Sequence, residues 1–227
     1  MWETLQEEIS HCRQCPRLVR YRETVASQPP PRFTGWSYWG RGVPGFGDPR
    51  ACLWVVGLAP AAHGANRTGR MFTGDSSGDW LYRALYETGF ANQPHSTHKE
   101  DGMELRGAYI SAAVRCAPPD NHPTSEELQA CFSYLFREWQ ALALSVVVIV
   151  PLGHIAYRQV RRLFPGEKAP PFQHGGIWEV GPYTVLCSYH PSLQNTQTRR
   201  LKWEAWMAIF QEARNRCIAK KMGDSDL

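Results

Sequence analysis

Four apolar runs, separated by segments with helical patterning, constrain the fold of this chain most strongly. The runs cover residues 51–58, 108–115, 145–152 and 183–189, and their lengths suit buried strands. Apolar strands that alternate with helices are typical of a parallel sheet with helices on both faces. We therefore expect an α/β protein with a three-layer α/β/α architecture. Residues 1–227 are expected to form a single domain around a central four-stranded parallel sheet.

The segments outside these runs carry clear helix and loop signals. Residues 2–28 have a helical pattern that is interrupted at Pro16. Thr124 and Glu127 form a capping box, which predicts the first turn of a long helix. Residues 29–49 contain five prolines and five glycines, so we expect a loop there.

Charge and hydropathy indicate where the protein is located and which partners it can bind. No apolar run approaches the roughly 20 residues that a membrane span requires, and the acidic start lacks the layout of a secretory signal. We therefore expect a cytoplasmic protein, and a monomer. The net charge of +4 permits a nucleic-acid partner. Residues 199–221 hold seven Lys or Arg against two Glu, which indicates either a nucleic-acid contact or a solvated helix face.

The seven cysteines favour metal binding or buried thiols over a disulfide framework, because no secretory signal precedes them. Cys12 and Cys15 form a C-x-x-C pair, whereas Cys116 and Cys131 lie 15 positions apart. Zinc and a [4Fe–4S] cluster both accept four thiolates, and structural zinc usually uses two short pairs. The wide second spacing favours a cluster, with zinc and buried thiols as alternatives. The other three cysteines are expected to be core residues: Cys52, Cys187 and Cys217.

A glycine-rich loop runs from Gly57 to Asp75, directly after the first apolar run. Gly64 and Gly69 have the spacing of a phosphate-binding loop, but Arg70 and a methionine follow where lysine and a hydroxyl residue would be required. The loop therefore does not indicate a nucleotide triphosphatase.

The side chains of this loop suggest a different site. Arg67 and Arg70 are candidates for contacts with phosphates, and Phe72 for stacking on a planar ring. Asp75 is either a general base or the N-cap of the next helix. His190 follows the last apolar run and is either a packed histidine or a hydrogen-bond donor. Because the carboxyl ends of parallel strands lie at one edge of a sheet, these groups are expected to meet.

Taken together, the block VVGLAPAAHGANRTGRMFTGD and the segments RCAPPDN and HPSLQNTQTRR resemble the uracil-DNA glycosylase superfamily, most closely its family 5. The resemblance covers nearly the whole chain. It implies hydrolysis of the N-glycosidic bond of a damaged base in DNA and a structural [4Fe–4S] cluster. The implied cluster ligands are Cys12, Cys15, Cys116 and Cys131.

The same resemblance assigns roles to the candidate site residues. Phe72 would stack on a flipped base, His190 would hydrogen-bond it, and Leu193–Thr196 would push into the duplex. The implied base-binding residues are Gly57, Ala59, Phe72, Ala112 and His190. We expect DNA contacts from Arg67, Arg70, Leu193, Gln194, Asn195, Arg199 and Arg200.

Two positions depart from the wider superfamily. Leu58 and Ala59 stand where relatives carry a catalytic Asp, Asn or Glu, and Ala112 stands where an Asn reads the uracil edge. Family 5 shares both losses and is associated with uracil, hydroxymethyluracil, hypoxanthine and ethenocytosine. Asp75 becomes the candidate that orients water or steadies the sugar cation, and Asn121 is a second candidate. Two alternatives remain, a mismatch-specific thymine glycosylase and an iron–sulfur nucleic-acid-binding protein without catalysis.

Overall fold

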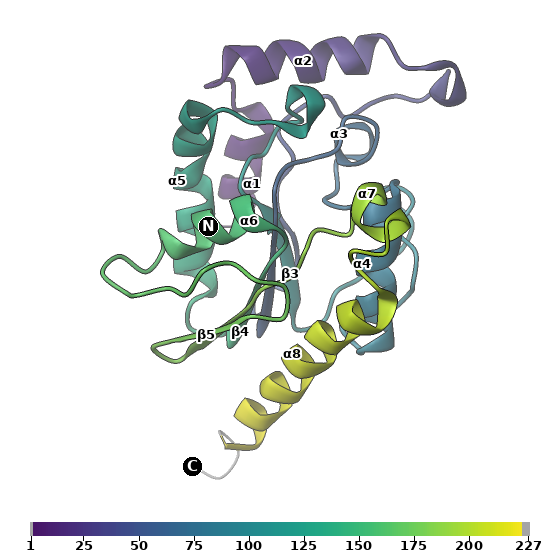
Figure 1. The fold of residues 1–227 in the computed structure, drawn as a ribbon. Helices are drawn as coiled ribbons and strands as arrows, with labels where there is room; N and C mark the ends of the chain where they lie inside the picture. The colour runs from purple at the N-terminus through teal and green to yellow at the C-terminus, as the bar shows by residue number, and fades with distance from the viewer. Residues whose placement is uncertain (1, 224–227) are drawn as a thin grey trace.

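The computed structural model describes residues 2–223, and its six strands form one sheet in the order β1-β3-β2-β4-β6-β5 (Figure 1). The four central strands run parallel to one another. They are β3 (Ala108–Ala112), β2 (Leu53–Gly57), β4 (Val148–Pro151) and β6 (Tyr183–Leu186). Each lies within one of the four apolar runs, so the predicted α/β fold with a parallel central sheet is confirmed.

Two antiparallel edge strands make the sheet larger than the sequence predicts. β1 (Phe46–Gly47) pairs with β3, and β5 (Ile177–Val180) pairs with β6. β1 is only two residues long and lies in a Pro- and Gly-rich segment, so it has no periodicity to detect. β5 alternates between exposed and buried residues and is joined to β6 by a turn at Gly181, which has a φ of 54°.

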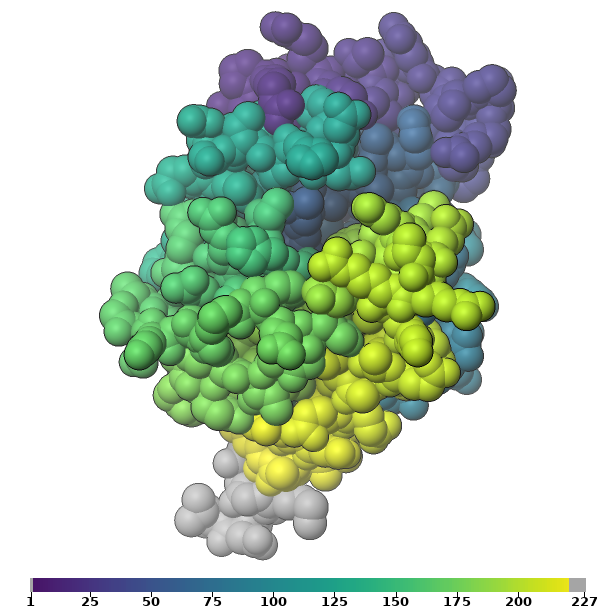
Figure 2. All heavy atoms as spheres, in the orientation of Figure 1, coloured from purple at the N-terminus to yellow at the C-terminus, as the bar shows by residue number. Residues whose placement is uncertain are grey.

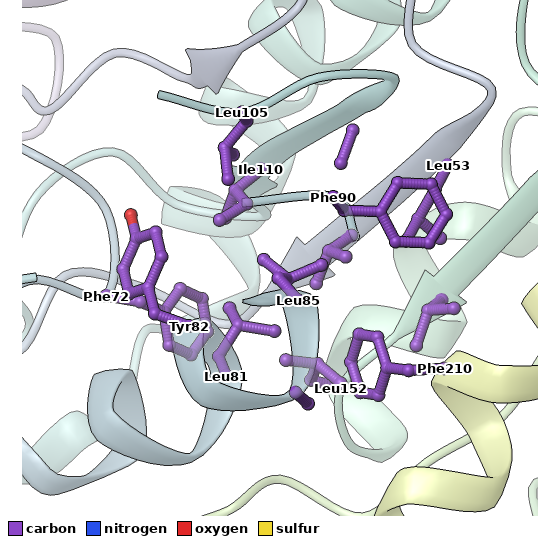
Figure 3. Close-up of a cluster of buried hydrophobic side chains, with 14 of the residues drawn as sticks. Leu53, Phe72, Leu81, Tyr82, Leu85, Phe90, Leu105, Ile110, Leu152 and Phe210 are labelled. Atoms are coloured by element: carbon purple, nitrogen blue, oxygen red, sulfur yellow. The ribbon is translucent and has the colours of Figure 1, made fainter. Parts of the chain in front are cut away.

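One face of the sheet is covered by α4 (Ser76–Glu87) and α8 (Trp203–Gly223). Leu53 and Val55 of β2 point to this face and are fully buried. Figure 3 shows how leucines of α4 and Phe210 of α8 pack against these strands. The apolar residues of α8 therefore pack on the sheet.

The opposite face is covered by α5 (Ser125–Leu142) and α6 (His154–Arg161). Trp54 and Val56, which alternate with the residues above, are fully buried on this side, and Trp54 stacks on Trp139 of α5 with centroids 5.7 Å apart. Since β2 is buried on both faces, its continuous apolar run has a structural cause. The predicted capping box is present at the start of α5.

The remaining elements form the rim of the sheet. The helical pattern over residues 2–28 breaks where expected, between α1 and α2. Among the described residues, no helix is long and apolar enough to cross a membrane. The elements outside the two helical layers and the sheet are α1 (Trp2–His11), α2 (Pro16–Ser27), η1 (Pro31–Phe33), α3 (Ala65–Thr68), η2 (Pro119–Asn121) and α7 (Leu193–Gln197).

Two cysteines differ from their prediction. Cys52, just before β2, and Cys217 of α8 form a disulfide, with Cα atoms 5.8 Å apart. Both belong to or pack against the core, as predicted, but the expectation of buried thiols in place of a disulfide is wrong, because α8 packs back onto the first residues of the central strand. A separation of 165 residues gives no local signal for this pairing. Cys187 is buried and free, as predicted.

Candidate active site

A cavity of about 630 Å³ opens at the carboxyl ends of the parallel strands. Its walls come from the loop after β2, the start of α4, η2, the start of α6 and α7. Figure 2 shows this hollow, in which dark blue residues of the loop after β2 lie between teal, green and yellow-green segments. The cavity therefore lies where the ends of parallel strands predict a ligand site.

Phe72 forms part of the cavity wall. Its side chain is mostly buried and its ring centroid lies 5.8 Å from that of His190, with the planes inclined by 30°. Its φ of 53° is a left-handed conformation that non-glycine residues adopt rarely and that often marks functional sites. A Cβ on Gly57 would come within 2.7 Å of the Phe72 ring, so glycine is needed there.

His190 also lines the cavity, directly after the last parallel strand. Burial lowers the pKa of its imidazole to about 4, so the ring is neutral at physiological pH. A neutral imidazole keeps one N–H donor. Its backbone carbonyl accepts a hydrogen bond from Nδ2 of Asn195 at 2.8 Å. His190 can therefore donate to a ligand without placing a positive charge in the cavity.

Asp75 is the N-cap of α4, which confirms one of the two roles predicted for it. Its Oδ1 accepts a hydrogen bond from the backbone N–H of Gly78 at 2.9 Å. Its Oδ2 lies against Gly64, where a Cβ would come within 2.1 Å of the oxygen. Burial raises the pKa of this carboxyl group. Because Asp75 also lines the cavity, capping leaves a carboxylate oxygen at the site.

The other predicted pocket residues divide into two sets. Leu58, Ala59 and Asn121 line the cavity, and Asn121 is exposed at its rim with a φ of 57°. Gly57 and Ala112 are not part of the cavity wall. They pair across β2 and β3 and are buried, and Ala112 belongs to the same core cluster as Phe72.

Arg67 and Arg70 are not at the protein surface, so their predicted contacts with DNA phosphates are corrected. Both side chains are buried. Arg67 donates to two backbone carbonyls of its own loop, and Arg70 forms a buried ion pair with Asp101 at 2.6 Å. The spacing of the loop gave no hint of Asp101, which lies in a later segment and neutralises Arg70.

The segment after His190 forms the short helix α7, which borders the cavity. Leu193 is 55% exposed, and both Leu193 and Gln194 line the cavity. Arg199 and Arg200 are exposed beside it, with the Arg200 guanidinium 4.5 Å from the Tyr189 ring centroid. Asn195 instead holds the backbone of His190, as described above.

Sequence reasoning missed two parts of the cavity wall. His154 stands at the start of α6, after Gly153, and Ser76 and Ser77 form the first turn of α4. The predicted site residues came from the loops after the first, second and last predicted strands. The loop after the third strand, which carries His154, ends at the same edge of the sheet and gave the same signal.

The four cysteines singled out by their spacing gather in one place. Cys12, Cys15, Cys116 and Cys131 are free, and all four line a second, small cavity between α1, α2 and α5. Among the residues that the structure describes, no three His, Cys, Asp or Glu side chains are placed to hold a single metal ion. Nη1 of Arg22 donates to Sγ of Cys116 at 2.8 Å.

Comparisons with known proteins identify the family of the chain. A family model described as the uracil DNA glycosylase superfamily matches residues 44–213. The chain is 47% identical to a type-5 uracil-DNA glycosylase of Thermus thermophilus over 93% of this chain and 96% of that protein. It is 45% identical to a type-5 uracil-DNA glycosylase of Pyrobaculum aerophilum, over 93% and 92% of the two chains. A type-4 uracil-DNA glycosylase of Pyrobaculum aerophilum is 28% identical over 84% of this chain and 82% of its own. The chain therefore belongs to the uracil DNA glycosylase superfamily and, within it, to the type-5 family.

Proposed function

We propose that this protein is a DNA base-excision repair glycosylase, a hydrolase that removes uracil and other deaminated or damaged bases from DNA. The observation that carries the proposal is the cavity in which Phe72, His190 and Asp75 meet. The curated relatives at 45% and 47% identity are uracil-DNA glycosylases, which supports the same activity. The product is DNA with an abasic site.

The base must leave the helix before its glycosidic bond reaches these side chains. Flipping costs a few kcal/mol, and least at mispairs. Leu193, exposed on α7 beside the cavity, is placed to fill the gap left in the duplex. Arg199 and Arg200 are exposed next to it, where they can hold phosphates.

Phe72 and His190 bind the flipped base. The Phe72 ring offers a stacking surface, and the His190 imidazole offers a neutral N–H donor. As the bond breaks, negative charge grows on the departing base. A donor fixed in a buried position stabilises that charge more in the transition state than in the ground state.

Asp75 acts on the other product of bond cleavage, the sugar cation. Its carboxylate stabilises the positive charge that develops on the sugar or orients the water that attacks it. Asn121, at the cavity rim, is a second group that positions this water. The beginning of the loop after β2 contributes no acid, because Leu58 and Ala59 line the cavity there.

The cavity predicts a broad range of bases. A site that binds a specific base edge through hydrogen bonds rejects other bases strongly, whereas an apolar wall does not. Leu58, Ala59 and Phe72 are apolar, and Ala112 supplies no edge-reading amide. We therefore propose that hydroxymethyluracil, hypoxanthine and ethenocytosine are also removed.

We further propose that the four clustered thiols hold a structural [4Fe–4S] cluster. Arg22 supports the fit because its side chain is buried, and no carboxylate among the described residues forms a salt bridge with it. A buried cation requires an anionic partner, and thiolates bound to iron supply one next to Arg22. Cys12, Cys15, Cys116 and Cys131 would each supply one thiolate to the cluster. When bound, the cluster ties α1 and α2 to α5.

Iron content tests the cofactor apart from activity. Protein purified without oxygen is expected to contain iron and sulfide and to absorb visible light. Cys131→Ala should lose the iron, the sulfide and the visible absorption. Cys187→Ser, a change at a buried cysteine outside the set of four, should keep all three. Stoichiometric zinc in place of iron, or a fully folded protein without metal, would overturn this assignment.

The activity is tested with a uracil-containing duplex that is incubated with enzyme and then cleaved at abasic sites with alkali. Cleavage at uracil is expected, and His190→Ala should slow single-turnover release by about 10²–10³-fold. Cleavage only at thymine opposite guanine would indicate a mismatch-specific enzyme. Binding without cleavage would indicate a nucleic-acid-binding protein that lacks catalysis.

A further inference from the structure

The segment Pro31–Tyr38, here called the aromatic segment, is fastened to the loop that forms the cavity wall. The buried guanidinium of Arg67 lies 4.4 Å from the ring centroid of Phe33 and 4.2 Å from that of Trp36. The same guanidinium donates to the carbonyls of His63 at 2.8 Å and Gly74 at 3.1 Å. Since Gly74 precedes Asp75, one side chain holds both the aromatic segment and the catalytic loop.

A second set of contacts joins the same two parts of the molecule. The hydroxyl of Tyr38 lies 3.0 Å from Nδ1 of His63, and the Phe33 and His63 ring centroids are 6.0 Å apart. His63 lies two residues after Ala61, which lines the cavity. The aromatic segment therefore packs against the loop that forms the cavity wall, and this contact gives it a defined position relative to the cavity.

The outer side of the aromatic segment has the composition of a nucleic-acid contact. Trp36 is 46% exposed, and the exposed Arg32 guanidinium lies 5.0 Å from the Phe33 ring centroid. No acidic residue occurs between Glu23 and Asp48, so no carboxylate of this stretch opposes a phosphate. Aromatic rings next to cations bind DNA strands by stacking and by charge.

We propose that the aromatic segment is a second DNA-contacting surface, which grips the strand that flanks the flipped nucleotide. The inference rests on the proposed glycosylase function. Trp36 packs on an exposed sugar or base of the flanking DNA, and Arg32 neutralises a neighbouring phosphate. Because Arg67 links the segment to Gly74, DNA held on this surface is fixed relative to Asp75. Two contacts, at α7 and at the aromatic segment, thus hold the duplex on two sides of the cavity.

Binding by Trp36→Ala and Arg32→Ala tests the surface. Two control variants each remove an exposed aromatic ring or an exposed arginine at the opposite end of the sheet: Tyr86→Ala, where the tyrosine is 47% exposed, and Arg106→Ala, where the side chain is 80% exposed. Dissociation constants are measured by fluorescence anisotropy, at several salt concentrations, on a duplex with a stable abasic-site analogue.

Trp36→Ala is expected to weaken binding about tenfold, which is the lower part of the range for a stacked base. Arg32→Ala should reduce the slope of log Kd against log salt by about 0.9, the value for one phosphate contact. Trp36→Phe should restore most of the affinity, which excludes a folding defect as the cause. When the duplex is shortened on one side of the lesion, the difference between Trp36→Ala and wild type should disappear.

The outcomes separate this inference from the function on which it rests. If wild-type protein releases uracil but Trp36→Ala and Arg32→Ala bind DNA as tightly as the two controls, the surface does not contact DNA. If wild-type protein releases no base, the proposed function fails. The binding measurements then still decide whether the aromatic segment contacts DNA, because they require no catalysis.

Discussion

Asp75 has one observed role, as the cap of α4, and one proposed role, in catalysis, and substitutions can separate the two. Its Oδ1 caps α4 through the Gly78 N–H, its Oδ2 lies against Gly64, and the residue lines the cavity. Asparagine is as good an N-cap as aspartate, whereas alanine cannot cap at all. Asp75→Asn thus removes the carboxylate and keeps the cap, and Asp75→Ala removes both.

The two variants are expected to differ in stability and to agree in activity. Loss of the cap should lower the free energy of unfolding of Asp75→Ala by about 0.5–2 kcal/mol. Asp75→Asn should be close to wild type at neutral pH, because burial already disfavours the ionised carboxyl group. Loss of the carboxylate should slow uracil release by about 10²–10⁴-fold in both variants. Thr124→Ala, which removes the cap of α5, serves as the control for cap loss alone.

The measurements are urea unfolding and single-turnover release of uracil from a duplex at saturating enzyme. The pKa of Asp75 is raised in the folded protein, so wild-type activity should fall as the pH drops through that raised value. The same shift favours the folded state at low pH, and this stability is lost as the pH rises through the folded pKa. If Asp75→Asn releases uracil within tenfold of wild type, Asp75 is a cap only and the catalytic assignment is refuted.

Three further predictions concern stability and pH. Reduction of the Cys52–Cys217 disulfide, or the double serine variant, should lower the free energy of unfolding by up to about 5 kcal/mol, since the bond closes a very long loop; equal urea midpoints with and without reductant would contradict this. Asp101→Ala leaves the Arg70 guanidinium buried without its partner, at a cost of about 3–5 kcal/mol by urea unfolding. Burial opposes ionisation of Asp101, but hydrogen bonds from Arg70 and from backbone amides outweigh burial and lower the pKa of Asp101 to about 2. The stability that the Arg70–Asp101 pair contributes is therefore lost only as the pH falls from about 4 to about 2. The His190 imidazole, with a pKa of about 4, should produce no change in uracil release between pH 8 and pH 6, as a pH–rate profile would show.

The sequence predicted the centre of the fold well and its edges poorly. The run that contains β2 is buried on both faces, and such runs can be recognised because every residue is apolar. β1 owes its conformation to pairing with β3, not to its own residues. The Cys52–Cys217 bond and the Arg70–Asp101 pair join segments that are far apart in the chain, so local patterns contain no trace of them.

The candidate site was predicted where chemistry and strand position coincide. Phe72, Asp75 and His190 were identified because they are chemically distinctive residues in loops at the carboxyl edge of the sheet. Arg67 was misassigned because a cation in a glycine-rich loop suggests phosphate binding. Its burial against Phe33 and Trp36 depends on a different segment that folds over the loop.

The cap that Asp75 forms on α4 is compatible with the catalytic role proposed for it, and the geometry of α4 explains why. The N-terminus of a helix presents free N–H groups and a partial positive charge, which favour a carboxylate by about 0.3–1 kcal/mol. The Gly78 N–H fixes the orientation of the side chain, and Gly64 leaves room for its second oxygen. At the other end of the loop, Leu58 has no comparable donor set. A carboxyl group there would lack what the helix offers at position 75, namely a fixed direction and partial compensation for burial. A carboxyl group at the end of the loop is therefore oriented and stabilised better than one at its beginning. This accounts for a loop that begins with apolar residues and carries its acid at the end.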